Sequence, residues 1–172
     1  MQKKTPVAKA MVRKYPESVV LVTTRSREGR DNVMAAGWVA VASGDPVMFM
    51  IGIDDGALTY ANIRKTREFV VVFPSERMAR ETLFVGEHHG HDLDKFAVTG
   101  LGVQKAAKVK APILADAVAN FECRLVKIVR PGDCPILFGK VVAAHENRNR
   151  ALKRLMTVGK GHRLRGVRAV PR

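Results

Sequence analysis

The residues best suited to chemistry lie at positions 30–38, which read Arg-Asp-Asn-Val-Met-Ala-Ala-Gly-Trp. Ala35, Ala36 and Gly37 are consecutive small residues, and they precede Trp38, the only tryptophan of the chain. Because no bulky side chain blocks the approach, a ligand can come close to the backbone N–H and C=O groups there. The segment therefore suits contact with a flat ligand such as a flavin ring, or with a phosphate group.

The two cysteines, Cys123 and Cys134, are close in sequence and suggest no disulfide framework. In a reducing compartment we expect two free thiols. Cys134 follows a predicted turn that ends in Gly132-Asp133. The pattern leaves two interpretations of Cys134 open: a small buried hydrophobic residue, or a redox-active thiol beside a cofactor.

A histidine-rich loop, containing His88, His89, His91 and Asp92, invites a metal-site interpretation. Neighbouring ligands on one loop rarely converge on a metal without a distant partner, and the chain has no C-x-x-C or H-E-x-x-H motif. We therefore predict no metal site. The loop is expected to border a ligand cleft instead, where a histidine can contact a cofactor or a second substrate.

The formal net charge of +14 is unevenly distributed, because no acidic residue follows Glu146. Nine basic residues occupy the end of the chain, namely Arg148, Arg150, Lys153, Arg154, Lys160, Arg163, Arg165, Arg168 and Arg172. Such a charge favours anionic partners, whether phosphate-bearing cofactors or nucleic acid. No aromatic residue accompanies it, so we expect a solvated basic C-terminal helix over 147–157 and a tail to 172, and no nucleic-acid partner.

The length of 172 residues and the hydrophobic content of 47% predict a single domain, residues 1–172, with a substantial core. No apolar run is long enough to span a membrane. Basic residues at the N-terminus precede no apolar stretch of the kind found in secretory signals. We therefore expect a cytoplasmic protein that does not contact a membrane.

Strands are predicted first at residues 18–25, 32–41 and 47–53, which are rich in valine and other apolar residues. Turn signals separate them, at Ser26-Arg27-Glu28-Gly29 and at Ser43-Gly44-Asp45-Pro46. Parallel neighbours need long crossovers, so short loops imply an antiparallel meander of these three strands.

The remaining pattern mixes strands with short helices. Further strands are predicted at 68–73, 119–129 and 135–145, and short helices at 7–14, 57–66, 76–86 and 93–98. At least six strands with a few helices predict a mainly β protein, a β-barrel whose openings are covered by short helices.

The order of several short blocks resembles the flavin-reductase-like proteins of the FMN-binding split barrel, in particular the flavoredoxin branch. The blocks are VLVTT, GRDNVMAAGW, DPVMFMI, IRKTREFVVV, DLDKF, TGL and PGDCPILFGKV. They extend roughly from Tyr15 to His145, and their order and spacing are more specific than any one of them. The resemblance implies a Greek-key-like split β-barrel that forms a homodimer, with FMN bound non-covalently near the dimer interface.

The same resemblance implies a set of cofactor-binding residues: Asn32, Met34, Ala35, Ala36, Trp38, Thr59 and Lys95. In the family, the backbone at the positions of Met34 to Ala36 lines the flavin. A hydroxyl and free N–H groups near a helix N-terminus, as at Thr59, suit a phosphate. A lysine at position 95 supplies a cation for the phosphate or for the reduced ring.

Each of these residues also has a structural interpretation. Trp38 can be a core or interface aromatic residue. Thr59 can be only a helix N-cap, and Lys95 only a solvated charge. Asn32 can be a turn residue that tolerates an unusual backbone conformation.

One block departs from the family pattern. Many flavin reductases of this family carry Gly-Asp-His in the turn where this chain has Gly132-Asp133-Cys134. A thiol cannot replace imidazole as a cation or as a two-ended hydrogen-bonding group at neutral pH. The substitution raises a question about nicotinamide use, and it makes Cys134 the one candidate for a catalytic side chain.

The resemblance implies an NAD(P)H-dependent flavin reductase, in which FMN takes a hydride from NADH or NADPH. The electrons then pass to a free flavin, to an electron-transfer protein or to another acceptor. The first alternative is a flavoredoxin-type FMN electron carrier without nicotinamide activity, which Cys134 favours. The second is a basic binding protein that uses the barrel without flavin.

Overall fold

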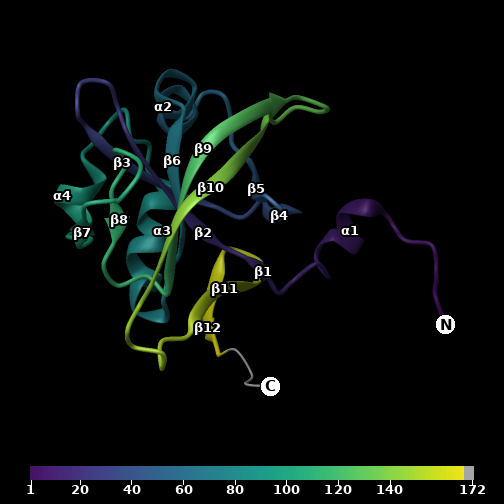
Figure 1. Ribbon diagram of the computed structural model, residues 1–172. Helices are drawn as coiled ribbons and strands as arrows, with labels where there is room; N and C mark the ends of the chain where they lie inside the picture. The colour runs from purple at the N-terminus through teal and green to yellow at the C-terminus, as the bar shows by residue number, and fades with distance from the viewer. Residues whose placement is uncertain (169–172) are drawn as a thin grey trace.

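An antiparallel seven-stranded sheet forms the centre of the computed structural model, which describes residues 1–168 (Figure 1). Its strand order is β3-β2-β6-β9-β10-β5-β4. The strands are β2 (Val20–Arg25), β3 (Asp31–Ala36), β4 (Val39–Gly44), β5 (Val47–Gly52), β6 (Glu68–Phe73), β9 (Ala119–Val129) and β10 (Ile136–Glu146). The predicted β-barrel is confirmed, although the sheet leaves β3 and β4 as its two edges.

Residues 32–41, predicted as one strand of a meander, form two strands instead, and the meander prediction is wrong. The chain leaves the strand conformation at Gly37 and Trp38, so β3 pairs with β2 while β4 pairs with β5. Trp38 C=O accepts a hydrogen bond of 2.8 Å from Gly52 N–H, which ties the break to the end of β5. The small-residue segment therefore connects the two edges of the split barrel.

Two hydrophobic clusters lie on the two faces of β6, whose residues Phe69 to Val72 are completely buried. Phe69 and Val71 point into the barrel interior, and Val70 and Val72 pack under the outer elements. This explains why β6 reads as a continuous apolar run rather than as an alternating pattern.

The helices form where they are predicted, within a few residues, and all except the first pack against the barrel (Figure 1). They are α1 (Val7–Met11), α2 (Leu58–Thr66), the 3₁₀ helix η1 (Glu76–Met78), α3 (Ala79–Glu87) and α4 (Lys95–Thr99). Figure 1 shows α3 and α4 on one side of the sheet, together with the small pair β7 (Val103–Gln104) and β8 (Ile113–Leu114). No helix within residues 1–168 is long and apolar enough to cross a membrane.

The predicted C-terminal helix over 147–157 is wrong. Asparagine side chains at 147 and 149 accept hydrogen bonds from backbone N–H groups two residues ahead, which favours turns over a helix. The chain then forms β11 (Arg154–Gly159) and β12 (Arg163–Val167), in a sheet with β1 (Glu17–Ser18). Leu155 and Thr157 alternate with more exposed residues, the period of a strand. Residues 169–172 of the predicted tail lie outside the described residues.

A buried carboxylate holds the segment before β8 against the barrel. Glu122, which is completely buried, accepts hydrogen bonds from the N–H groups of Ala107, Lys108 and Val109 at 2.6 to 3.0 Å. His145 Nε2 lies 2.5 Å from the same carboxylate. Burial alone would raise the pKa of Glu122, but these hydrogen bonds outweigh it and lower the pKa. Glu122 is therefore a structural anchor.

Candidate functional site

A cavity of about 390 Å³, here called the β3 cavity, opens beside the end of β3. Its size suits a small-molecule ligand. Five parts of the chain line it: the segment 14–19 before β2, the segment from β3 to the break, the end of β5 with the residues after it, helix α3, and the hairpin β11–β12. The residues used below are Met34, Ala35, Ala36, Gly37, Trp38, Gly52, Thr82, Gly86, Thr157 and His162.

Small residues bring β3 and α3 close together at this cavity. A Cβ atom placed on Gly86 would lie 3.3 Å from the Cβ of Ala35, which is tighter than an ordinary contact. Ala36 packs into the barrel interior, and Met34 packs against the same cluster. With these side chains directed into the two cores, the end of β3 presents a wall of backbone and small side chains to the cavity, as the sequence predicts.

Asn32 and Thr59 form a buried pair next to this wall. Asn32 Nδ2 donates to Thr59 Oγ1 at 2.8 Å, and the two residues are 4% and 1% exposed. The N-cap of α2 is Ala57, so the interpretation of Thr59 as an N-cap is wrong. Asn32 lies within β3 rather than in a turn. The structure thus brings these two predicted residues into contact, but neither lines the β3 cavity.

Lys95 is buried at the start of α4, so the interpretation as a solvated charge is wrong. The residue is 4% exposed, and Nζ donates to the carbonyl oxygen of Val85 at 2.7 Å. Burial lowers the pKa of Lys95 to about 8. Asp94 caps α4 by accepting from two backbone N–H groups and makes no ion pair with Lys95. A buried lysine with one hydrogen bond retains capacity for an anionic ligand.

Trp38 is 61% exposed and separates the β3 cavity from a second cavity, so a place in the core is wrong for this residue. The second cavity measures about 530 Å³ and lies over β4, β5 and the turn at 131–134. We call it the β4 cavity. Glu17, Gly37, Trp38 and Gly52 line both cavities.

Cys134 lines the β4 cavity and not the β3 cavity. A Cβ atom on Gly52 would lie 3.6 Å from its Sγ. Burial raises the pKa of the Cys134 thiol, and the nearby carboxylates of Asp133 and Asp54 raise it further. Cys123 is completely buried, with a pKa raised to about 12. Both thiols are free, as predicted, and neither is activated as a thiolate at neutral pH.

The histidine loop covers the Asn32–Thr59 pair rather than either cavity. Gly90 packs directly on Asn32, and Arg30 holds the loop by donating to the carbonyl oxygens of Gly90 and Leu93 at 3.0 and 3.1 Å. His88 stacks on Phe84 with ring centroids 4.0 Å apart. Within residues 1–168, no three His, Cys, Asp or Glu side chains are grouped so that they could hold a metal ion.

The residues of α3 and of the C-terminal hairpin that line the β3 cavity are not predicted from the sequence. Thr82 is 2% exposed, and its hydroxyl has no hydrogen-bond partner. Thr157 and His162 come from the hairpin β11–β12 that replaces the predicted helix. The alternation at Leu155 and Thr157 was the available signal for this hairpin.

The arrangement can hold a flat ligand against the β3 backbone, but it contains no assembled catalytic side chains. No activated nucleophile lines the β3 cavity, and Lys95, the one buried Lys or Arg among residues 1–168, lies outside the cavity and next to α3. Such a site suits chemistry that a bound cofactor carries out, with the protein supplying position and electrostatics.

A comparison with protein families matches residues 11–163 to the family described as the flavin reductase like domain. Among curated relatives, an uncharacterized protein of Pyrococcus abyssi is 36% identical over 129 residues, which cover 75% of this chain and 73% of the relative. The FMN reductase (NADH) RutF of Bradyrhizobium diazoefficiens is 28% identical over 127 residues, covering 73% and 67%.

Solved structures share the fold. Flavoredoxin of Desulfovibrio vulgaris (Miyazaki F) superposes with a TM-score of 0.84 at 22% identity, covering 99% of this chain and 96% of that chain. An FMN-binding protein from Thermus thermophilus with bound 1-cyclohex-2-enone gives a TM-score of 0.82 at 24% identity, covering 98% and 95%. These likenesses identify the architecture as the split barrel, in agreement with the sequence-based prediction.

Proposed function

Because the chain belongs to the flavin reductase like family, we propose that it binds FMN in the β3 cavity and passes electrons through it. The proposed donor is NADH or NADPH, and the acceptor is a free flavin, an electron-transfer protein or another small molecule. The observation that carries the proposal is the cavity itself, whose wall is backbone and small side chains at Ala35, Ala36 and Gly37. Relatives named as an FMN reductase (NADH) and as an FMN-binding protein support the choice of cofactor.

FMN, when bound, supplies the hydride and electron transfer, and the residues of the chain provide its binding and orientation. The end of β3 leaves room for a flat ring, with Trp38 at the mouth. Asn32 and Thr59 form a buried hydrogen-bonded pair, and Lys95 is a separate buried cation that donates to the carbonyl oxygen of Val85. None of the three lines the β3 cavity, and we propose that the phosphate group extends beyond the cavity toward Lys95 because this residue supplies a positive charge.

The absence of histidine at position 134 favours a second candidate, an FMN electron carrier without nicotinamide activity. Cys134 carries a raised pKa and stays a neutral thiol, so it supplies no positive charge for a second substrate. It also lies on the far side of Trp38 from the β3 cavity. Two free thiols support a reducing, cytoplasmic setting for either candidate.

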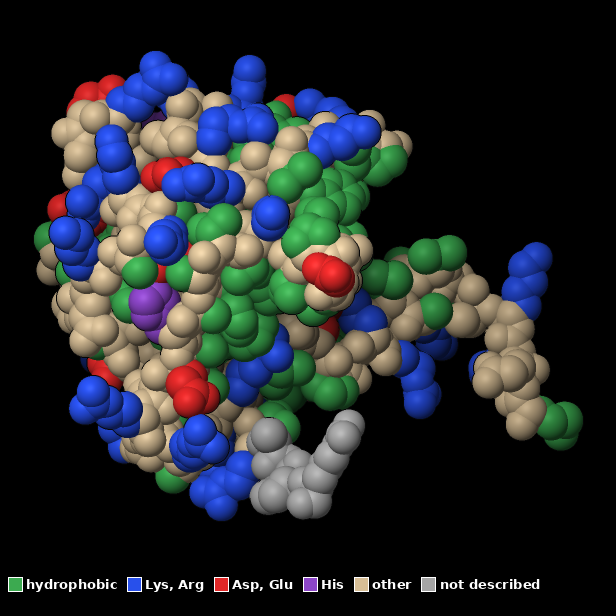
Figure 2. Space-filling model, in the orientation of Figure 1, with side chains coloured by type: hydrophobic (Ala, Val, Ile, Leu, Met, Phe, Trp, Pro, Cys, Tyr) green, Lys and Arg blue, Asp and Glu red, His purple; other side chains and the backbone are tan. Residues whose placement is uncertain are grey.

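We also propose that the protein is a homodimer that buries the face of β4 and β5. Trp38, Val41, Val47 and Met50 are 61%, 65%, 44% and 37% exposed, and they belong to two neighbouring strands and to the break before them. Figure 2 shows hydrophobic side chains gathered over this part of the sheet. An apolar face of this kind is unusual on a monomer and suits a self-complementary interface.

An absorbance titration separates the candidates. The purified protein is mixed with FMN, freed of excess, and treated without oxygen with NADH and then NADPH. The reductase proposal predicts retained flavin bands that bleach with at least one nucleotide. Retained flavin that stays oxidised supports the electron carrier instead, and failure to retain flavin contradicts both.

A further inference from the structure

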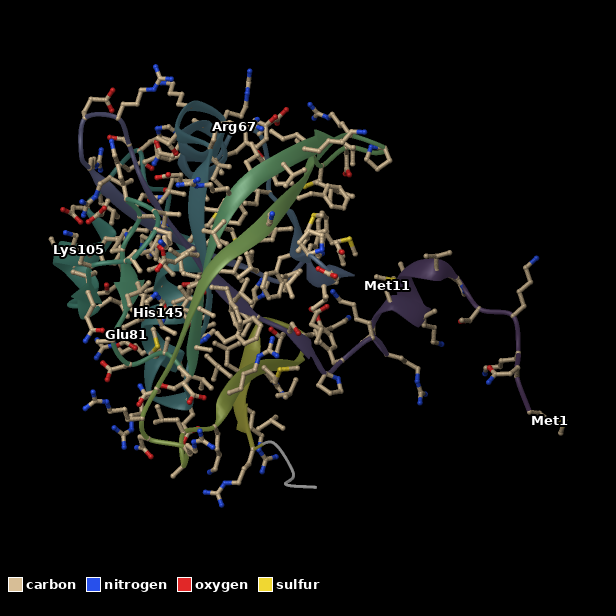
Figure 3. The ribbon with its side chains drawn as sticks, in the orientation of Figure 1. Met1, Met11, Arg67, Glu81, Lys105 and His145 are labelled. Atoms are coloured by element: carbon tan, nitrogen blue, oxygen red, sulfur yellow. The ribbon has the colours of Figure 1, made fainter. Side chains whose placement is uncertain are left out.

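Residues 1–14 form an N-terminal arm, which extends away from the barrel up to its last residue, Lys14, where it meets the rim of the β3 cavity (Figure 1). Helix α1 within it contains no buried residue, and Val7, Met11 and Val12 are 77%, 52% and 39% exposed. Figure 3 shows Met1 and Met11 on the side opposite Lys105, with Met1 far from the barrel. The arm therefore carries apolar side chains that its own chain does not cover.

A helix as short as α1 is not stable alone in water. Its five residues are held by few backbone bonds, such as those from Lys9 and Ala10 N–H to the carbonyl oxygen of Pro6. Isolated helices shorter than about 12 residues are marginal even in favourable sequences. A surface that covers Val7 and Met11 would stabilise this helix, since the two side chains lie four positions apart on one face.

The positive charge of the arm indicates the kind of surface on which it can dock. Five basic residues and no acidic residue occur in it, namely Lys3, Lys4, Lys9, Arg13 and Lys14. Lys14 forms an ion pair of 2.6 Å with Glu17 at the base of the arm. The arm therefore requires an apolar surface with an acidic border, on a protein whose net charge is +14.

The β4 cavity provides that combination. Trp38, Met50 and Ile136 contribute apolar lining, and the cavity is open. Asp133 lines its border, and Asp54 and Asp55 lie near enough to Cys134 to influence its thiol. Arg130 neutralises part of this charge through an ion pair of 2.6 Å with Asp55. Carboxylates still outnumber cations around Cys134.

We propose that the basic arm of one copy docks in the β4 cavity of a second copy of this chain. The inference rests on the proposed homodimer. Glu17 and Ser18, at the base of the arm, themselves line the β4 cavity, so this cavity lies where the arm leaves the barrel. In a two-fold dimer built on the adjacent β4–β5 face, each arm would cross to the partner's cavity, and both arms would be exchanged equally.

Docking of the arm in the β4 cavity would also affect the proposed flavin site, through Trp38. Trp38 lines both cavities, so an arm in the β4 cavity would contact one side of Trp38 while the β3 cavity adjoins the other. An arm docked in this way would be a positioning element for the mouth of the proposed flavin site.

Chemical crosslinking to the natural Cys134 tests the proposal directly. Single cysteines are introduced at Val7→Cys or Met11→Cys, and the full-length protein is treated with a short bismaleimide. Cys123 is completely buried and does not react. Docking predicts a covalent dimer on a denaturing gel, which disappears when Cys134→Ser is added. Val98→Cys, on an equally exposed valine of α4, serves as the matched control and gives no such dimer.

Sedimentation and flavin absorbance of the same samples keep the outcomes distinct. A dimer in solution without the covalent product overturns arm docking and leaves the homodimer intact. A crosslink within one chain overturns the exchange between copies. A monomer in solution overturns the homodimer and arm docking together, while the flavin spectrum independently reports on the proposed function.

A charge variant provides a second test. Replacing Lys3, Lys4 and Lys9 by glutamate should raise the dimer dissociation constant about tenfold, or about 1.4 kcal/mol, because the arm would then be repelled by the acidic border. Lys105→Glu, an exposed basic residue on the opposite side, should leave the constant unchanged. Equal effects of the two variants would overturn the proposal.

Discussion

The β3 and β4 cavities share Trp38 as a common wall but differ in what lines them. The β3 cavity is bordered by packed small residues and by polar side chains such as Thr82 and Thr157. The β4 cavity is more open, mainly apolar, and lies beside exposed Val41 of the edge strand β4. A less open site with more polar groups suits a small ligand, whereas a more open apolar face suits another protein. The contrast supports the proposals that the cofactor binds in the β3 cavity and that a second copy of the chain binds at the β4 cavity.

The largest predicted effect comes from a charge placed on the β4–β5 face. Val41→Glu buries an unpaired carboxylate in the proposed interface, so we expect the dimer dissociation constant to rise at least ~100-fold. Val98→Glu, on α4, should leave the association unchanged. Analytical ultracentrifugation of both variants gives the dimer dissociation constants. A fully dimeric Val41→Glu protein would show that the β4–β5 face is not the dimer interface.

The next effect separates affinity from stability at Lys95. Lys95→Met should weaken FMN binding by about 10- to 100-fold, because a charge-assisted hydrogen bond to the phosphate is lost. The same change should raise the free energy of unfolding, since a buried ammonium is replaced by an apolar side chain of similar shape. Flavin titration and urea denaturation give the two values. Unchanged FMN affinity would assign Lys95 a purely structural role.

The pH dependence of stability should carry the signature of the same lysine. Its pKa falls from 10.5 in the unfolded chain to about 8 in the fold. Between these values the unfolded state binds more protons than the folded state, so stability rises with pH relative to Lys95→Met. Below pH 8 both states are protonated and the difference between the two proteins should be constant. A difference that stays constant from pH 7 to 10 would show that the pKa is not lowered.

A smaller effect concerns the unpaired hydroxyl in the β3 cavity wall. Thr82→Val should stabilise the protein by roughly 1 kcal/mol, because a buried hydroxyl without a partner is removed. That gain corresponds to about 2–4 °C in melting temperature. Thr59→Val is the matched control with the opposite sign, since it leaves Asn32 Nδ2 without its acceptor. A destabilised Thr82→Val protein would mean that the hydroxyl has a partner.

The smallest effect is predicted for Cys134. Cys134→Ser should change the rate of flavin reduction by less than ~3-fold, or about 0.6 kcal/mol, because the thiol faces the β4 cavity and is not activated. Stopped-flow reduction with a nicotinamide or an artificial donor provides the rate. A larger decrease in the rate would show that Cys134 takes part in flavin reduction, and would contradict the separation of the two cavities by function.

Local patterns predicted much of the fold because they are set by neighbouring residues. The apolar run of β6, the turn before α2 and the long hairpin β9–β10 all have short-range signals in residue type and spacing. The break at Gly37 was missed for the opposite reason. A strand that continues and a strand that crosses to the other edge of the sheet contain the same residue types, and only the pairing partners distinguish them.

Some residues of the candidate site are likewise predicted from local sequence patterns, and others are not. The small residues of β3 predict the wall of the cavity. The family resemblance names Asn32, Thr59 and Lys95 as cofactor-binding residues, and the structure shows that they are buried outside the cavity. Thr82 and His162 could not be assigned to the site from sequence, because α3 and the C-terminal hairpin reach the cavity only through tertiary packing. The exposure of Trp38 likewise depends on the break that the sequence analysis missed.

The most direct test of FMN binding in the β3 cavity is an absorbance titration of FMN into the wild-type protein and into the Gly37→Phe variant. Gly37 is exposed, and a Cβ atom there meets only Ser18 O at 3.9 Å, so the fold accepts a side chain that fills the cavity mouth. If FMN binds in the β3 cavity, we expect one FMN per wild-type chain and at least ~100-fold weaker binding to Gly37→Phe. The surface control Gly102→Phe should bind FMN with the affinity of the wild type. FMN bound equally well by Gly37→Phe, or no FMN bound by the wild type, would contradict FMN binding in the β3 cavity.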